Sequence, residues 1–154
     1  KEVREANKYS WRPIIEVAVV FLGIFITMTP TIMYLNQNAA DLGLTKPWQF
    51  YYFAGGLSSF LDNAPTAVAF HSVATALPIE GTAVAGISEI LLKAIALGSV
   101  FFGAMTYIGN GPNFMVKAIA EENGIKMPSF FGYMIKFSLI VLLPIYILVQ
   151  IIFL

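Results

Sequence analysis

Cysteine is absent from the 154 residues, which excludes disulfide bonds and thiolate metal sites. Charge is scarce as well, because only 12% of the residues are charged, whereas a typical soluble domain has about 25%. The charges cancel to a net of zero and no basic run is interleaved with aromatic residues, so no nucleic-acid partner is expected. Apolar residues make up 58% of the chain, and lipid is the natural solvent for that excess.

Two long apolar stretches are each predicted to cross a membrane as a helix. Residues 14–36 would rise about 34 Å as a helix, enough for a hydrocarbon core of about 30 Å. Residues 129–154 form a second span with one charge, Lys136, near its start, and Pro144 predicts a kink. Residues 1–12 are polar and are expected to form an interfacial helix or the end of a loop. Because the chain starts without Met or a signal-peptide pattern, we expect it to belong to a longer protein.

A third apolar stretch, 48–77, is interrupted by the hexapeptide Leu-Asp-Asn-Ala-Pro-Thr at 61–66. Proline disfavours helix in the residue before it and lacks an N–H donor, but together with a capping Asp or Asn it starts a new helix well. The two arms, Trp48–Ser59 and Ala64–Leu77, would each rise only about 18–21 Å. They are therefore expected either to stack as one interrupted span or to fold back as a re-entrant hairpin.

The distribution of Lys and Arg favours the hairpin. With the N-terminus in the cytoplasm, where four basic residues cluster, a hairpin places seven basic residues inside and two outside. A through-span places five inside and four outside. Because basic residues prefer the cytoplasmic side, a hairpin that enters from outside fits better. The N-terminus is then cytoplasmic, the C-terminus lies outside, and the inner (plasma) membrane of the cell is the expected location.

Residues 94–122 are predicted to form a broken helix. The interruption is the pentapeptide Gly-Asn-Gly-Pro-Asn at 109–113, and the helix over 94–108 would rise about 22 Å, which places the break inside the bilayer. Residues 79–93 are expected to lie at the interface. The predicted fold class is thus an all-α polytopic membrane protein, a single domain over 1–154. It has three transmembrane crossings, one of them broken, and one re-entrant helical hairpin.

The two interruptions are predicted to carry the function. Irregular backbone at membrane depth is tolerated only where it is buried in protein or lines a wet cavity, and paired discontinuous helices point to a transporter's binding site. Side-chain oxygens suit a hard cation such as sodium. The candidate ion- or substrate-binding residues of the two breaks are Ser58, Ser59, Asp62, Asn63, Thr66, Thr106, Gly109, Asn110, Gly111 and Asn113.

Sodium is expected at Asp62, Asn63 and Asn110. Asp62 would be the one formal charge among neutral oxygens, and a carboxylate held away from water takes up a proton more readily, so such a site can exchange sodium for a proton. The alternative for Asp62 is a turn with a capping aspartate, and the alternative for the second break is a plain loop. His71 is a candidate proton relay or else a hydrogen-bonded packing residue. No cofactor is expected beyond the transported sodium.

Two segments, Gly56–Thr66 and Gly103–Asn113, resemble the ion transporter superfamily, closest to the NhaD-type sodium/proton antiporters and the citrate-transport proteins grouped with them. The resemblance covers nearly the whole chain from about Pro13. It implies two inverted repeats, of which this chain is the C-terminal one. In each repeat a re-entrant hairpin and a broken helix would meet at the midplane of the membrane, and the hairpin tip and the helix break would be the functional positions. Carboxylate symporters of this superfamily tend to show Ser-Asn-Thr at the tips, whereas the Asp-Asn-Ala-Pro-Thr here favours cation exchange.

The function predicted first is sodium/proton antiport by alternating access, with the hairpin and the broken helix sliding together against the other spans. The second hypothesis is a sodium-coupled carrier of citrate, a dicarboxylate or another anion, held at helix N-termini. The third, an intramembrane aspartyl protease, needs two facing carboxylates and only Asp62 lies deep, so the chain is not expected to be an enzyme. Expected partners are the lipid bilayer, the missing N-terminal repeat and a second copy in a homodimer. The fragment alone is expected to be inactive.

Overall fold

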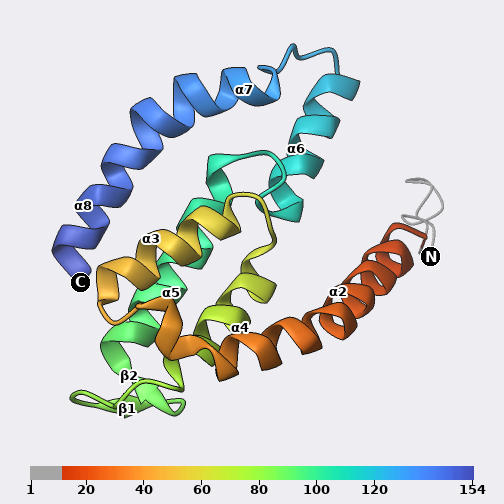
Figure 1. The fold of residues 1–154 in the computed structure, drawn as a ribbon. Helices are drawn as coiled ribbons and strands as arrows, with labels where there is room; N and C mark the ends of the chain where they lie inside the picture. The colour runs from red at the N-terminus through yellow and green to blue at the C-terminus, as the bar shows by residue number, and fades with distance from the viewer. Residues whose placement is uncertain (1–11) are drawn as a thin grey trace.

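Helices make up most of the structure, which confirms the mostly helical prediction (Figure 1). The computed structural model describes residues 12–154, so the prediction for the interfacial segment 1–12 lies almost entirely outside the described residues. In chain order the elements are α2 (Arg12–Gln37), the 3-10 helix η1 (Ala39–Leu42), α3 (Pro47–Ser58), α4 (Asn63–Ala74), β1 (Ala83–Val84), β2 (Ile87–Ser88), α5 (Glu89–Phe102), the 3-10 helix η2 (Gly103–Met105), α6 (Gly111–Glu122), α7 (Phe130–Tyr133), the π-helix η3 (Met134–Leu142) and α8 (Leu143–Phe153).

α3 and α4 form the two arms of a helical hairpin. α3 begins with Pro47 at its first position, and α4 begins after Asp62, whose side chain accepts a hydrogen bond from the Ala64 N–H. The start of α3 and the chain after α4 meet, because Pro47 and Leu77 line the same cavity. The arms therefore fold back on one another, which is the arrangement that the charge distribution favoured (Figure 1).

The broken helix is interrupted earlier and over a longer stretch than the sequence predicted. α5 ends at Phe102, η2 follows, and the chain then leaves helical geometry until α6 begins at Gly111. The predicted helix up to Ile108 is wrong, because the Thr106 hydroxyl accepts the N–H groups of Ile108 and Gly109 at 3.2 and 2.9 Å. A threonine that bonds its own neighbouring backbone competes with the helix.

A small antiparallel ribbon corrects the all-α prediction. β1 and β2 pair with each other inside the segment 79–93 that was predicted to be interfacial. The turn between them consists of Ala85 and Gly86, with φ angles of 52° and 82°. Positive φ at both turn residues is what a two-residue hairpin needs to match the twist of its strands. The Ala-Gly pair is a weak turn signal, because Ala rarely adopts this conformation.

α3 packs more extensively against α5 than any other two elements pack together in the described chain. A methyl group at Gly98 of α5 would collide with the backbone of Tyr51, and one at Gly55 of α3 would lie 2.5 Å from the Phe102 ring. Small residues allow such close approach of two helices. The Tyr51 hydroxyl also donates to the Tyr146 carbonyl of α8 at 2.9 Å. The hairpin and α5 thus form one closely packed unit to which the last helix is attached.

Gly98→Ala is expected to destabilise the protein, because the added methyl group has no room beside the Tyr51 carbonyl. Overpacking of this kind lowers the free energy of unfolding by about 1–3 kcal/mol. The matched control is Gly56→Ala in α3, where nothing lies within 4 Å and where Ala forms helix better than Gly. Thermal unfolding in detergent should show a lower midpoint for Gly98→Ala alone. Equal midpoints would contradict the close approach of α3 and α5.

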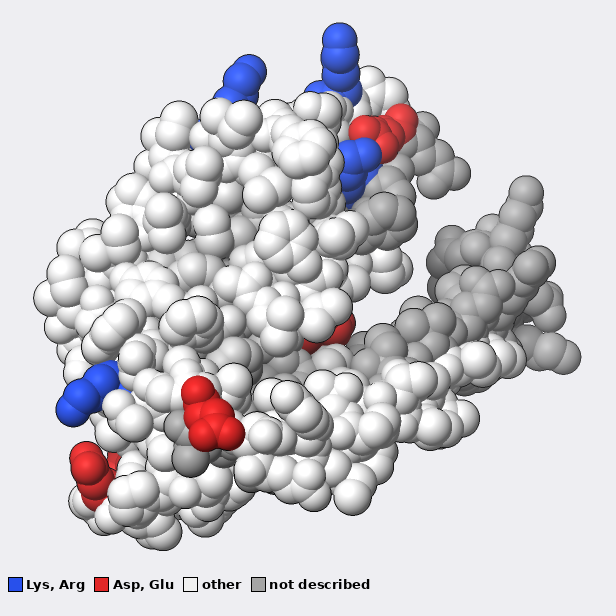
Figure 2. Space-filling view, viewed as in Figure 1, with Lys and Arg blue, Asp and Glu red and all other residues white. Residues whose placement is uncertain are grey.

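Most charged side chains gather at two opposite ends of the molecule, and the surface between them is largely uncharged apart from one acidic patch (Figure 2). Charged residues around the α6–α7 connection are Lys117, Glu121, Lys126 and Lys136, and those around the ribbon include Glu80, Glu89 and Lys93. Within the described residues, one continuous helical stretch, Phe130–Phe153, is long and apolar enough to cross a membrane. The number of crossings stays a prediction.

Candidate functional site

The hairpin tip lies against the break between α5 and α6. From the tip, the Ser58 hydroxyl lies 2.5 Å from the Ser99 carbonyl oxygen, and the Ser59 hydroxyl donates to the Phe102 carbonyl at 3.3 Å. From the break, the Thr106 hydroxyl donates to the Ser59 carbonyl. Ser58 and Thr106 are fully buried. The structure thus brings together the two interruptions that the sequence analysis paired.

Five oxygen atoms gather around two glycines of the break. A methyl group at Gly103 would collide with Asn63 Oδ1 and lie 3.2 Å from the Gly109 carbonyl oxygen. A methyl group at Gly109 would lie within 3.0 Å of the carbonyl oxygens of Gly103, Ser59 and Ser58. We call Asn63 Oδ1 and these four carbonyl oxygens the tip–break cluster. Unwound helix carbonyls are the type of group that coordinates sodium in discontinuous-helix transporters. Three of the five oxygens also accept hydrogen bonds, Asn63 Oδ1 from the Ser58 hydroxyl, the Ser59 carbonyl from the Thr106 hydroxyl and the Gly103 carbonyl from the Asn113 amide.

Two asparagines hold the backbone of the break in place. The Asn113 side-chain amide donates to the carbonyls of Gly103 and Thr106, both at 3.3 Å. Asn110 Oδ1 accepts the Asn113 N–H at 3.0 Å and so caps α6. Gly111 is the first residue of α6 and has open space where a side chain would be. Of these predicted residues, Asn113 therefore supports the cluster, whereas Asn110 and Gly111 start the helix.

Asp62 precedes the cluster residue Asn63 and caps α4. Its carboxylate accepts the Ala64 N–H at 3.3 Å, and its carbonyl accepts the Thr66 hydroxyl at 3.1 Å. The Asp62 side chain is partly exposed, whereas Thr66 is buried. The capping role that was weighed for Asp62 is thus visible in the structure, and Asp62 directly precedes the cluster residue Asn63 in the chain.

His71 lies toward the other end of α4. It is eight residues beyond Asn63, which corresponds to about 12 Å along the helix axis. Its Nε2 is 3.0 Å from the Ala85 carbonyl oxygen in the turn of the ribbon. This contact ties the ribbon to the hairpin, which is the packing role weighed for this residue, and the proton relay stays a prediction.

The last helix contributes residues that the sequence analysis missed. This helix consists of α7, η3 and α8. It donates to the break from Tyr133 Oη to the Ala104 carbonyl at 3.0 Å and from Ser138 Oγ to the Met105 carbonyl at 2.6 Å, and to the end of α5 from Tyr146 Oη to the Phe101 carbonyl at 2.6 Å. A hydroxyl in an otherwise apolar span signals a contact between helices, but the sequence does not tell which segment it meets. Gly103 was missed because a single glycine is also tolerated inside a helix.

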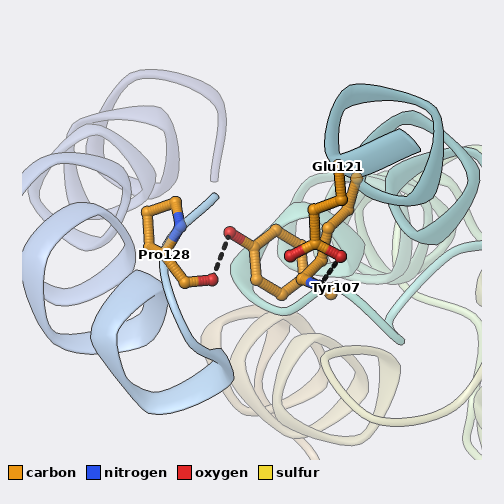
Figure 3. Close-up of polar contacts among 4 residues, drawn as sticks. Tyr107, Glu121 and Pro128 are labelled. Carbon is orange, nitrogen blue, oxygen red and sulfur yellow. Dashed lines mark hydrogen bonds and ion pairs between the residues drawn. The ribbon is translucent and has the colours of Figure 1, made fainter. Parts of the chain in front are cut away.

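A cleft of about 450 Å³ opens beside the break at the lysine-rich end. Tyr107 lines it and donates from its hydroxyl to the Pro128 carbonyl at 3.2 Å (Figure 3). Lys117 pairs with Glu121 at 2.7 Å and lies 5.4 Å from the centre of the Tyr107 ring, a cation–π arrangement. Lys126 lines the cleft as well. Because Tyr107 belongs to the break, the cleft connects the charged end of the molecule with it.

Comparison with known proteins identifies a family for this chain. The model of a family described as "Putative citrate transport" matches residues 1–154. No curated protein and no solved structure matches the chain. The match includes both the hairpin and the broken helix, and therefore every residue of the tip–break cluster.

Proposed function

The chain belongs to the citrate-transport family whose model it matches, so it is a membrane transport protein, and we propose that it exchanges sodium ions for protons by alternating access. The observation that carries this proposal is the tip–break cluster, a group of uncharged oxygens where two interrupted helices meet, one of them from Asn63, which follows the capping residue Asp62 in the chain. Discontinuous helices of this kind form the ion sites of secondary transporters.

The cluster favours a cation because all of its atoms are oxygens. Sodium would take the carbonyl oxygens of Ser58, Ser59 and Gly109 together with Asn63 Oδ1 in place of its water shell. Asp62 would supply the negative charge that balances the ion. When sodium leaves, Asp62 would take up a proton in its place. The empty site would then return across the membrane without net charge.

The charge at the hairpin tip favours a cation over an anion at the start of α4. A helix N-terminus attracts anions through its free N–H groups and its dipole. In α4 this position is already occupied by Asp62, whose carboxylate accepts the Ala64 N–H. A substrate carboxylate would meet a like charge there, whereas a cation would meet an opposite one.

The moving unit in our proposal consists of the hairpin, the broken helix and the last helix. Tyr51 of α3 donates to a carbonyl of α8, and Tyr146 of α8 donates to the Phe101 carbonyl of α5. These bonds extend the predicted moving unit by the last helix. α2 packs against α4 and otherwise extends away from this unit (Figure 1), so α2 would stay with the static part and with the missing N-terminal repeat.

In this proposal the lysine-rich end of the molecule faces the cytoplasm. Lys117, Lys126 and Lys136 lie at that end, and basic residues prefer the cytoplasmic side of a bilayer. The ribbon and the C-terminus would then face outward. The cleft at Tyr107 would be the route by which ions reach the cluster from inside the cell.

A sodium-coupled citrate carrier is the second candidate, and two observations favour it. The family description names citrate, and two lysines, Lys117 and Lys126, line the cleft beside the break. The N-terminus of α6, capped by the neutral Asn110, would be the place for a substrate carboxylate. In this case sodium in the tip–break cluster would balance the charge of the anion.

Fluxes measured with the purified full-length protein in lipid vesicles test the proposal. A sodium gradient should drive proton movement, reported by a pH-sensitive dye inside the vesicles, and labelled citrate should not accumulate. Sodium-driven citrate accumulation without proton movement would replace the antiport by the second candidate. The absence of both fluxes would contradict both candidates.

A further inference from the structure

The middle of the last helix is wound as a π-helix. η3 covers nine residues, Met134–Leu142, between α7 and α8. π turns are rare, occur mostly as single-turn bulges and are frequent at functional sites. A local cause is Pro144, which has no N–H and whose ring clashes with the carbonyl four residues before it, at Ile140. Wider winding before the proline relieves that clash.

The hydroxyls of this helix reach the carbonyls at the end of α5 and in η2. A helix that stops leaves its last carbonyls without donors of its own, and a buried carbonyl without any donor is costly. Ser138 is fully buried, and its Oγ lies 2.6 Å from the Met105 oxygen. The hydroxyls of Tyr133 and Tyr146 donate to two further carbonyls in the same stretch, those of Ala104 and Phe101. The last helix therefore supplies the donors that allow α5 to end inside the molecule.

The π winding is what places these hydroxyls on one side of the helix. An α-helix turns about 100° per residue, so residues five apart lie about 140° apart around its axis. In a π-helix the hydrogen bond itself joins residues five apart, and such residues return to the same side. Tyr133 and Ser138 are five apart. With α winding throughout, Ser138 would point away from Met105 when Tyr133 faces Ala104.

We propose that η3 is a positioning element for the ion site. By aligning Tyr133, Ser138 and Tyr146, it holds the break unwound, so that the carbonyls of Gly103 and Gly109 stay beside the hairpin tip. The three hydroxyl residues are positioning residues, since the oxygens of the tip–break cluster come from other side chains and from the backbone. The inference deepens the proposed transport function and rests on it for the identity of the ion.

Ser138→Ala in the full-length protein removes one hydroxyl and little volume. We expect the sodium concentration for half-maximal flux to rise about tenfold, as the loss of a buried hydrogen bond implies, with the maximal rate within about twofold of the wild type. Ser138→Thr keeps a hydroxyl at the same place and should restore the wild-type value. Tyr133→Phe, which also removes a single hydroxyl, should act in the same direction as Ser138→Ala.

A second readout does not depend on transport. The 154 residues contain no cysteine, so Ile108→Cys, at a half-exposed position of the break, introduces their single thiol. Any cysteine elsewhere in the full-length protein is first replaced by serine. Two double variants are compared, Ile108→Cys with Ser138→Ala and Ile108→Cys with Ser138→Thr. A membrane-impermeant maleimide should label the cysteine several-fold faster in the first, because the break is held less firmly without the Ser138 hydroxyl.

A variant with a shortened last helix tests whether the alignment of the hydroxyls matters rather than the π winding itself. Removing Ile135 and Val141 together leaves Tyr133, Ser138 and Tyr146 at spacings of four and seven residues, which an ordinary α-helix places on one side. This variant should keep both the wild-type sodium dependence and the slow labelling.

Equal labelling and equal sodium dependence of Ser138→Ala and Ser138→Thr would overturn the positioning role. If the wild type shows no sodium flux but labelling differs as expected, the transport proposal fails and the positioning role stands.

Discussion

Gly109→Ala is expected to remove most sodium-dependent transport, whereas Gly111→Ala, two residues away, should leave it intact. A methyl group at Gly109 would lie within 3.0 Å of three carbonyl oxygens, and nothing lies within 4 Å of one at Gly111. Carbonyl oxygens belong to the backbone and cannot rotate aside as a side chain can. Overpacking costs about 1–3 kcal/mol. In our proposal this cost falls on the arrangement of the cluster that binds sodium, so at about 1.4 kcal/mol per tenfold change it lowers sodium affinity about 5- to 150-fold.

Sodium titrations of the flux in vesicles, together with thermal midpoints of both variants, test this expectation. Both glycines belong to the same pentapeptide, so the pair differs in the surroundings of the methyl group rather than in its chemistry. The same sodium dependence for both variants would show that the tip–break cluster is not the ion site. A lower affinity with an unchanged midpoint would show that the effect is on the site and not on folding.

Asp62→Asn is expected to abolish sodium-driven proton movement while the protein stays folded. Asn caps a helix about as well as Asp, so the start of α4 at the Ala64 N–H is retained. What the substitution removes is the negative charge and the proton-binding group. A dye assay of proton flux in vesicles should therefore fall to the level of empty vesicles, with a thermal midpoint close to that of the wild type.

Asp62→Ala and Asp41→Asn are the controls for this experiment. Asp62→Ala removes both the charge and the cap, so it should also lower the thermal midpoint, since loss of a capping side chain costs about 0.5–2 kcal/mol. Asp41→Asn makes the same chemical change in the short helix η1, away from the hairpin tip, and should leave the flux unchanged. Intact sodium-driven proton movement in Asp62→Asn would refute the assignment of Asp62 as the proton carrier.

The hairpin and the start of α6 were predictable from the sequence because proline and capping residues act on their immediate neighbours. Pro47 and Pro65 each lie in the first turn of a helix, and Asp62 and Asn110 cap the helices that follow them. These preferences belong to a few neighbouring residues and hold in almost any surroundings. The observed arms are accordingly within a few residues of the predicted ones.

The true beginning of the break was not predictable in the same way. The run from Gly103 to Ile108 is apolar enough to continue a helix, and Thr106 alone is a weak helix breaker. The helix ends at Phe102 because partners from other elements stabilise the free carbonyls. Among them are the Ser59 hydroxyl and the Asn113 side-chain amide. The π-helix η3 was not predictable either. Pro144 predicts a kink in the last helix, but not nine residues of π winding before it.

By itself the sequence determined that this protein is helical and suited to lipid, that two of its apolar segments are interrupted, and that Asp62 lies at one interruption. These are consequences of composition and of short-range backbone chemistry. Only the tertiary structure decided which oxygens gather at Gly103 and Gly109, and that the last helix supports them. The reason is physical: these contacts join residues that are tens of positions apart, such as Ser58 with Ser99 and Ser138 with Met105. No local preference specifies such a pairing, because it depends on how the helices pack.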